Sequence, residues 1–188
     1  MAKLRKEFFI MKKQKITTKM LVTLAMLLAL EIVLSRFLSI QTPVTRIGFG
    51  FVPLVIAGIL FGPIPASIVA VLSDVLGALL FPTSGAYYPP LTITSFLVGL
   101  TYGLFLYKAT FDPKKVKDWL RVVLTVAVRQ GVWALLLQSY WLSLLYGNTY
   151  KQTVTMRIPQ VLLLSAVEIV VIPILIKAAG MIKKSVNL

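Results

Sequence analysis

The stretch from Met20 to Leu38 reads MLVTLAMLLALEIVLSRFL and contains only two charged residues, Glu31 and Arg36. A helix needs roughly 20 mostly apolar residues to cross a hydrocarbon core about 30 Å thick, so this stretch predicts a transmembrane helix. It has no Ala-x-Ala cleavage pattern, which favours an uncleaved helix over a signal peptide. Residues 1–19 are basic and polar, with Met11 as an alternative start to Met1. We expect them to form a cytoplasmic tail.

The rest of the chain has the same apolar character. Of its 188 residues 58% are apolar and 14% are charged, and the mean hydropathy is +0.88. Average soluble domains are about one-quarter charged, so this composition argues against a water-soluble fold. After subtracting tails and turns, the length leaves room for about six crossings at roughly 20 residues each.

Five further apolar segments follow, separated by polar or proline-containing turns, at about 48–61, 66–81, 91–107, 119–146 and 154–179. The first of these is short and is interrupted by three glycines and Pro53, which is typical either of a tilted short helix or of a broken helix near a transport site. The predicted fold is an all-α membrane bundle of six transmembrane helices. Residues 20–179 form the bundle, and residues 180–188 form a second cytoplasmic tail.

The basic residues support this topology. With both termini inside, fifteen Lys and Arg side chains fall on inner segments and four on outer ones, as the positive-inside rule requires. The net charge of +14 therefore indicates orientation and attraction to membrane lipid, not binding of nucleic acid. The four outer residues are Arg36, Arg46, Lys151 and Arg157.

The chain has no histidine and no cysteine. It thus lacks the usual general base, the thiolate nucleophile and the common zinc ligands, and we expect neither an enzyme nor a metal site. No Gly-x-x-x-x-Gly-Lys-Ser/Thr motif occurs, so energy for transport must come from a partner or from a gradient.

Three of the six acids fall inside predicted spans, Glu31, Asp74 and Glu168, and Arg129 is their basic counterpart, about eight residues past the charged start of its helix. Charges at such depth normally face a partner or a cavity. Either Arg129 pairs with Glu168 or Asp74 and holds helices together, or some of these groups line a solute site. The helix of Arg129 carries further polar and aromatic residues, namely Gln130, Trp133, Gln138 and Tyr140.

The four outer basic residues would attract an anion, because arginine holds carboxylates through paired hydrogen bonds. Aromatic residues near them offer stacking surfaces for a flat ring, or else form an ordinary membrane-interface girdle. In the loop after residue 81, Tyr87 and Tyr88 are either part of that girdle or part of a ligand lid. The aromatic candidates are Phe49, Phe51, Tyr87, Tyr88, Trp133, Trp141 and Tyr146.

Several segments between residues 20 and 178 resemble the folate-specific substrate-binding (S) components of energy-coupling factor (ECF) transporters. They are ALEIVLSRFLSIQT at 29–42, RIGFGFVP at 46–53, FGP at 61–63, SDVLGALLFP at 73–82, YYP at 87–89, WLSLLYG at 141–147 and RIPQ at 157–160.

This resemblance implies a six-helix vitamin-binding bundle in a bacterial cell membrane. Such a bundle captures its ligand outside and releases it inside by tipping over in the membrane, together with a transmembrane scaffold subunit and two cytoplasmic ATPases. Ala25 and Ala29 would face the scaffold. The ligand implied is folate, with no other cofactor. S components for riboflavin, thiamine, biotin, pantothenate and pyridoxine share the fold and remain alternatives. A stand-alone carrier or a membrane enzyme is a less favoured alternative.

Folate combines a flat pterin, an aromatic linker and a glutamate with two carboxylates. The hypothesis places Asp74 or Gln130 at the pterin edge and Arg36, Arg46 or Arg157 at the acidic tail, with Arg129 among the buried charges that line the site. The ring faces would meet Phe49, Tyr87, Tyr88 or Trp133.

Overall fold

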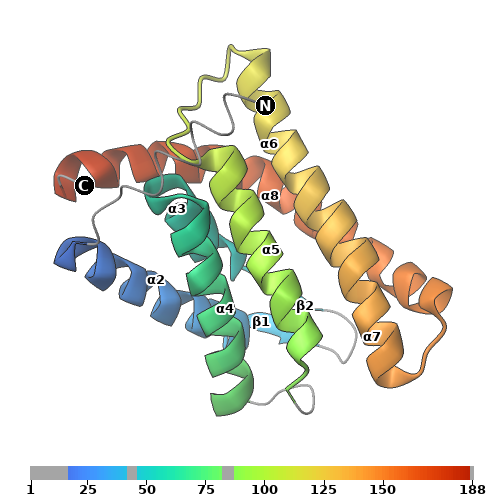
Figure 1. Cartoon of the computed structure of the whole chain (residues 1–188). Coiled ribbons are helices and arrows are strands. Elements are labelled where there is room, and N and C mark those ends of the chain that lie inside the picture. The colour runs from blue at the N-terminus through green and yellow to red at the C-terminus, as the bar shows by residue number, and fades with distance from the viewer. Residues whose placement is uncertain (1–16, 42–45, 82–86, 187–188) are drawn as a thin grey trace, which may run out of the picture.

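The computed structural model describes residues 17–41, 46–81 and 87–186, with the backbone alone described for Gln41, Arg46 and residues 182–186. It is helical apart from one short hairpin (Figure 1), which confirms the all-α prediction. The elements are α2 (Thr18–Arg36), β1 (Ser39–Gln41), β2 (Arg46–Gly48), α3 (Phe51–Phe61), α4 (Pro63–Leu80), α5 (Pro89–Leu106), α6 (Val116–Val126), η1 (Ala127–Leu137), α7 (Gln138–Tyr146) and α8 (Tyr150–Val186).

Five helical segments in the described chain are long and apolar enough to cross a membrane: α2, α4, α5, the continuous rod α6–η1–α7, and α8. The sixth apolar helix, α3, has 11 residues and is about 16 Å long at 1.5 Å per residue. That length covers about half of a hydrocarbon core. The six-span count and the orientation of the termini remain predictions.

The helix ends follow local sequence signals. Thr17 caps α2, because its hydroxyl accepts a hydrogen bond from the Met20 amide at 3.3 Å. Gly62 adopts a φ of +88°, and Pro63 then occupies the first turn of α4, where a missing N–H costs nothing. Most observed boundaries lie within a few residues of the predicted ones.

The hairpin was not predicted. The sequence suggested a polar turn followed by a helix from about Gly48, whereas α3 begins at Phe51 and residues 46–48 form a strand. The two strands pair antiparallel, with Ser39 opposite Gly48. A Cβ atom on Gly48 would lie 2.5 Å from the Cβ of Ser39, so glycine permits this close approach.

The rod α6–η1–α7 contains eleven π-helical residues in its middle. A π-helix uses i→i+5 hydrogen bonds and turns side chains to positions that a regular helix would not give them, and it often occurs at functional sites. Arg129, Gln130 and Trp133 all lie on this segment.

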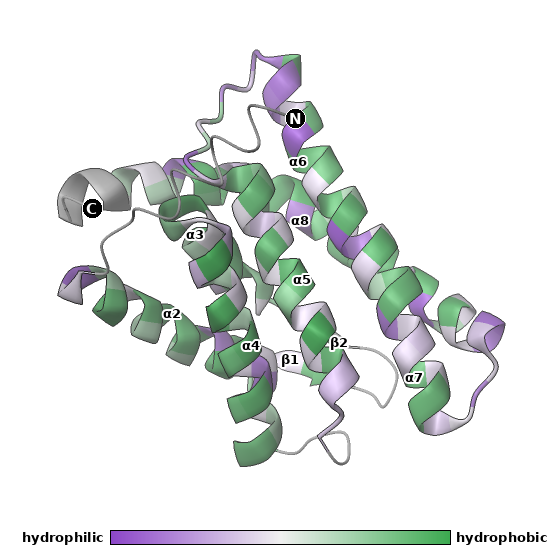
Figure 2. Cartoon of the chain, in the orientation of Figure 1, coloured by the Kyte–Doolittle hydropathy of each residue, from purple (hydrophilic) through white to green (hydrophobic). Residues whose placement is uncertain are grey.

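Helices α4 and α5 pack at very short range through glycines. A Cβ atom on Gly103 would lie 2.1 Å from the Cα of Pro63, and one on Gly99 would lie 2.7 Å from the Cα of Ser67. The buried core around this contact includes Val55, Tyr102 and Ile172, each with no exposed surface. Many large apolar side chains are exposed on the helices, and hydrophobic residues predominate along most of their length (Figure 2), as expected for a surface that faces lipid.

One end of the bundle holds the β1–β2 hairpin, the last turn of α4, the first turn of α5 and the turn between α7 and α8 (Figure 1, bottom). We call it the hairpin end. The connection between α5 and α6 lies at the opposite end. In the predicted topology the hairpin end faces the outside of the cell.

Candidate functional site

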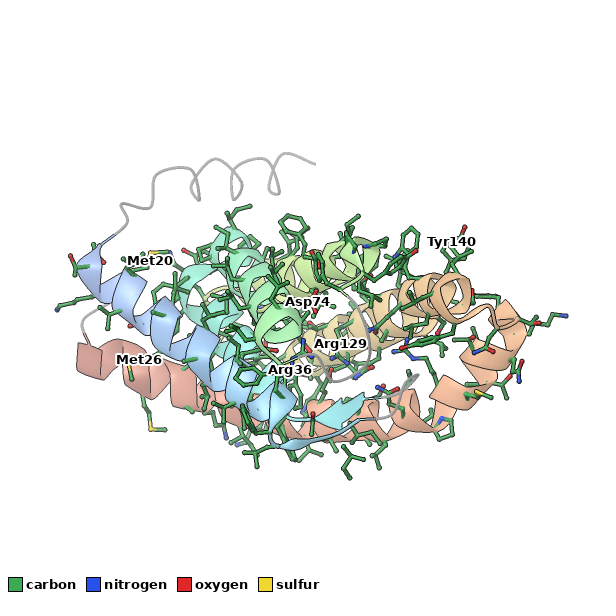
Figure 3. The ribbon with its side chains drawn as sticks, turned by 90° about the horizontal axis from the view of Figure 1, so that it is seen from below. Met20, Met26, Arg36, Asp74, Arg129 and Tyr140 are labelled. Atoms are coloured by element: carbon green, nitrogen blue, oxygen red, sulfur yellow. The ribbon has the colours of Figure 1, made fainter. Side chains whose placement is uncertain are left out.

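Arg36 is the last residue of α2 and reaches across to α4 at the hairpin end. Its guanidinium lies against Gly77, where an added Cβ would meet Nε at 2.6 Å, and Nη1 donates to the carbonyl oxygen of Phe81 at 3.4 Å. Asp74 and Glu31 lie within electrostatic range of it. Figure 3 shows Arg36, Asp74 and Arg129 in the interior of the helix ring. Two of the predicted site residues, Arg36 and Asp74, therefore come together.

Asp74 belongs to a chain of hydrogen bonds that joins α4 to the start of α5. Thr92 Oγ1 donates to Asp74 Oδ2 at 2.7 Å, and the hydroxyl of Tyr87 lies 2.9 Å from the same Thr92 oxygen. Because threonine has a single hydroxyl proton, which it gives to Asp74, Tyr87 is the donor to Thr92. Thr92 was not predicted as a site residue. The sequence feature that could have indicated it is a hydroxyl side chain one helical turn after Tyr88 in an otherwise apolar helix.

Arg129 and Gln130 of η1 both contact Glu168 of α8. Arg129 Nη1 lies 3.0 Å from Glu168 Oε1, and Gln130 Nε2 donates to the same oxygen at 2.9 Å. Glu168 has no exposed surface, and the Tyr102 hydroxyl lies beside the pair. Of the two partners predicted for Arg129, the structure therefore pairs it with Glu168 and not with Asp74. The pair links η1 to α8.

Arg157 of α8 lies in the interface with α7. It is 2% exposed, and Nη2 donates to Oε1 of Gln138 at 2.9 Å. The sequence suggested a place on the outer rim, whereas the guanidinium is buried. Seven residues into α8, it lies about 10 Å along the helix from the hairpin end.

The aromatic candidates occupy two places. Trp133 is half-buried and donates its Nε1 proton to Thr101 at 2.8 Å. Phe49 and Tyr87 are exposed, and Tyr88 is half-buried at the start of α5. Phe49 also lies beside Phe51, with ring centroids 6.4 Å apart. Three of the four thus lie at the hairpin end, while Trp133 lies further along the rod.

Arg46 stands opposite Gln41 in the hairpin, but its side chain lies outside the described atoms. Ala25 and Ala29 are exposed on α2, as is Met26 between them at 69%, so the predicted coupling face is open. Among the residues that the structure describes, no group of three or more metal-ligating side chains comes together.

An apolar helical bundle with five segments long enough to cross a membrane, and with polar and charged side chains buried between them, defines the class of multi-pass membrane proteins. Comparison with known families makes the class specific. A family described as "ECF-type riboflavin transporter, S component" matches residues 15–180. The chain belongs to this family of S components, whose members are transport proteins and not enzymes.

Known relatives give a more detailed comparison. The folate transporter FolT of Clostridium novyi (strain NT) is 42% identical over 131 residues, which cover 70% of this chain and 72% of that protein. FolT of Leuconostoc mesenteroides subsp. mesenteroides is 33% identical over 136 residues, or 72% and 70% of the two chains. A crystal structure of FolT bound with folic acid matches with a TM-score of 0.75 and 32% identity, over 83% of this chain and 91% of that one.

Proposed function

We propose that this chain is the folate-binding S component of an ECF-type importer. It crosses the membrane six times with both termini in the cytoplasm, captures folate at the hairpin end and releases it inside. Release would use a transmembrane scaffold and two cytoplasmic ATPases, as membership of the S-component family implies, and the chain itself has no Gly-x-x-x-x-Gly-Lys-Ser/Thr motif. The FolT names of the relatives and the folic acid in the structural neighbour support folate as the ligand.

The observation that carries the proposal is the chemistry gathered at and just below the hairpin end. Asp74 accepts from Thr92 there and lies within electrostatic range of Arg36. Aromatic side chains lie at the same end, and the buried Arg157 lies deeper, between α7 and α8, within a bundle whose outer surface is apolar. Pterin has N–H donors that a carboxylate can accept, flat faces for aromatic contact, and a dicarboxylate tail for arginine.

Individual roles follow from what each side chain already contacts. We assign Asp74 to the pterin edge in preference to Gln130, because a carboxylate accepts stronger hydrogen bonds from the pterin N–H groups than the neutral amide oxygen of Gln130 does. Phe49, Tyr87, Tyr88 and Trp133 remain the candidates for the ring faces. Arg36, Arg46 and Arg157 remain those for the tail, and Arg129, which is neutralised by Glu168, lines the deeper wall.

The scaffold subunit would dock on α2. Ala25 and Ala29 are exposed one helical turn apart, and small residues let another helix approach closely. The remaining apolar surface would face lipid, and the basic tails would lie near anionic headgroups.

The test is a titration of the purified chain in detergent with folic acid, riboflavin and thiamine, followed by tryptophan fluorescence. Trp133 and Trp141 lie on the rod that borders the site, so folic acid should quench their emission at stoichiometric concentrations while the other two vitamins should not. Tight riboflavin binding would instead support the function named in the matching family description, and would refute the folate assignment. Folate uptake by vesicles that contain this chain alone would refute the need for a partner.

A further inference from the structure

Arg157 is a buried cation that no carboxylate of the described chain neutralises. The interhelical ion pair beside it, Arg129–Glu168, does not include Arg157. Arg157 is 2% exposed, and its one hydrogen bond goes to the neutral amide of Gln138. In the part of the chain that the structure describes, its Nε and Nη1 find no acceptor. Buried charges are normally paired and fully hydrogen-bonded, so this guanidinium lacks both an anion and acceptors.

The charged residues near Arg157 add to its lack of a negative partner. Arg129 lies close enough to Arg157 to repel it, and the charge of Arg129 is already met by Glu168 at 3.0 Å. The α7–α8 side of the described site therefore carries one positive charge in excess. At the α2–α4 side, by contrast, two carboxylates, Glu31 and Asp74, lie within electrostatic range of Arg36.

We infer that Arg157, held in place by Gln138, binds a carboxylate of the ligand, and that the carboxylates at the α2–α4 side orient the ligand across the bundle. The acidic tail points to the α7–α8 interface, and the ring lies toward Asp74 and Thr92, where a carboxylate would be repelled. This rests on the proposed function. It goes further by selecting one arginine from three and by fixing the direction of the ligand. A carboxylate supplies what the site lacks, a negative charge and acceptor oxygens for the N–H groups of Nε and Nη1.

The test compares folic acid with its dimethyl ester, in which both glutamate carboxylates are neutral. The unmodified chain should bind the acid at least about tenfold more tightly, as expected for charged hydrogen bonds to a buried guanidinium. Arg157→Gln should lose this preference and bind the diester within about threefold of the unmodified chain. Arg121→Gln, which changes an exposed arginine of α6, should keep the preference.

A second variant works from the other side of the contact. Gln138→Glu places a carboxylate beside Arg157 with almost no change of shape, so it should raise the melting temperature and lower the affinity for folic acid while sparing the diester. If Arg157→Gln does not fold, comparison of Gln138→Glu with the unmodified chain still tests whether Arg157 binds a carboxylate of the ligand.

The results separate the two proposals. Equal binding of acid and diester by the unmodified chain would overturn the role of Arg157 and leave folate binding intact. The role of Arg157 would also be overturned if a folded Arg157→Gln variant still bound folic acid more tightly than the diester. The same holds if Gln138→Glu bound folic acid as tightly as the unmodified chain. Failure to bind either compound, with tight binding of another vitamin, would refute the proposed function itself.

Discussion

Replacement of Glu168 by glutamine tests the buried pair that joins η1 to α8. Glu168 has no exposed surface, and its Oε1 meets Arg129 Nη1 at 3.0 Å and Gln130 Nε2 at 2.9 Å. Glu168→Gln keeps the size and one acceptor oxygen but removes the charge. No other carboxylate in the described residues lies within 4.0 Å of Arg129, so the variant leaves a buried guanidinium without an anion.

The expected cost is large. Removing one partner of a buried ion pair destabilises a protein by about 3–5 kcal/mol. For a chain of this size each kcal/mol lowers the melting temperature by about 2–4 °C, so Glu168→Gln should melt roughly 6–20 °C below the unmodified protein. The assay is thermal unfolding in detergent, followed by tryptophan fluorescence without ligand. Adding Arg129→Met to the variant should recover much of the loss, because the uncompensated charge is then gone.

A matched control is available in the α5–α6 connection. Lys115 and Asp112 form an ion pair of 3.7 Å, with side chains 69% and 44% exposed. Exposed pairs contribute about 0–1 kcal/mol, so Asp112→Asn should leave the melting temperature nearly unchanged. A difference of two or three degrees corresponds to about 1 kcal/mol. If the melting temperature of Glu168→Gln lies that close to the melting temperature of Asp112→Asn, the Arg129–Glu168 pair does not stabilise the fold as argued.

Three further predictions concern packing, binding and coupling. Gly103→Ala should lower the melting temperature by several degrees, because the new Cβ would meet the Pro63 backbone at 2.1 Å and overpacking costs about 1–3 kcal/mol. Gly131→Ala, with nothing within 4 Å, should not lower it, and equal losses would contradict the close helix contact. Asp74→Asn should weaken folate binding at least about tenfold, and an unchanged titration would remove Asp74 from the pterin edge. Ala29→Trp should abolish folate uptake by cells while the purified chain still binds folate, whereas Leu162→Trp, at an exposed position of α8, should leave both intact. Normal uptake by the Ala29 variant would exclude this face as the docking surface.

The helices could be predicted because their signals are local. Hydropathy places the start of α2 at Met20, against Thr18 in the structure, and Gly62 followed by Pro63 marks a break that the backbone has at that point. The hairpin could not be predicted in this way. Strands of three residues are too short for an alternating pattern, and their pairing depends on contacts with the helices around them.

The sequence predicts which charged residues belong to the site but not which of them pair with one another. Intramembrane charges are rare enough that Asp74, Arg129 and Glu168 stand out in the sequence. Which of the two acids Arg129 meets depends on how η1 turns its side chains, and eleven residues of π-helix change that direction relative to an ideal helix. Thr92 reaches Asp74 because α5 packs against α4. The spacing of residues within one helix does not predict such a contact between two helices.

The short α3 explains why the polar residues gather at the hairpin end. At about 16 Å α3 covers only half of the hydrocarbon thickness, and it begins directly after β2 and ends at the turn into α4 on the opposite side. In the proposed topology the hairpin occupies the remaining depth. Non-helical backbone is tolerated there only where protein encloses it or where it faces water, and pairing between Ser39–Gln41 and Arg46–Gly48 satisfies its hydrogen-bonding groups. The Arg129–Glu168 pair lies deeper, beside Tyr102, where the two opposite charges compensate each other between packed helices. Arg36 and Asp74, at the hairpin end, lie where paired non-helical backbone and charged side chains occur together, so the short α3 and the ligand site proposed there have a common structural origin.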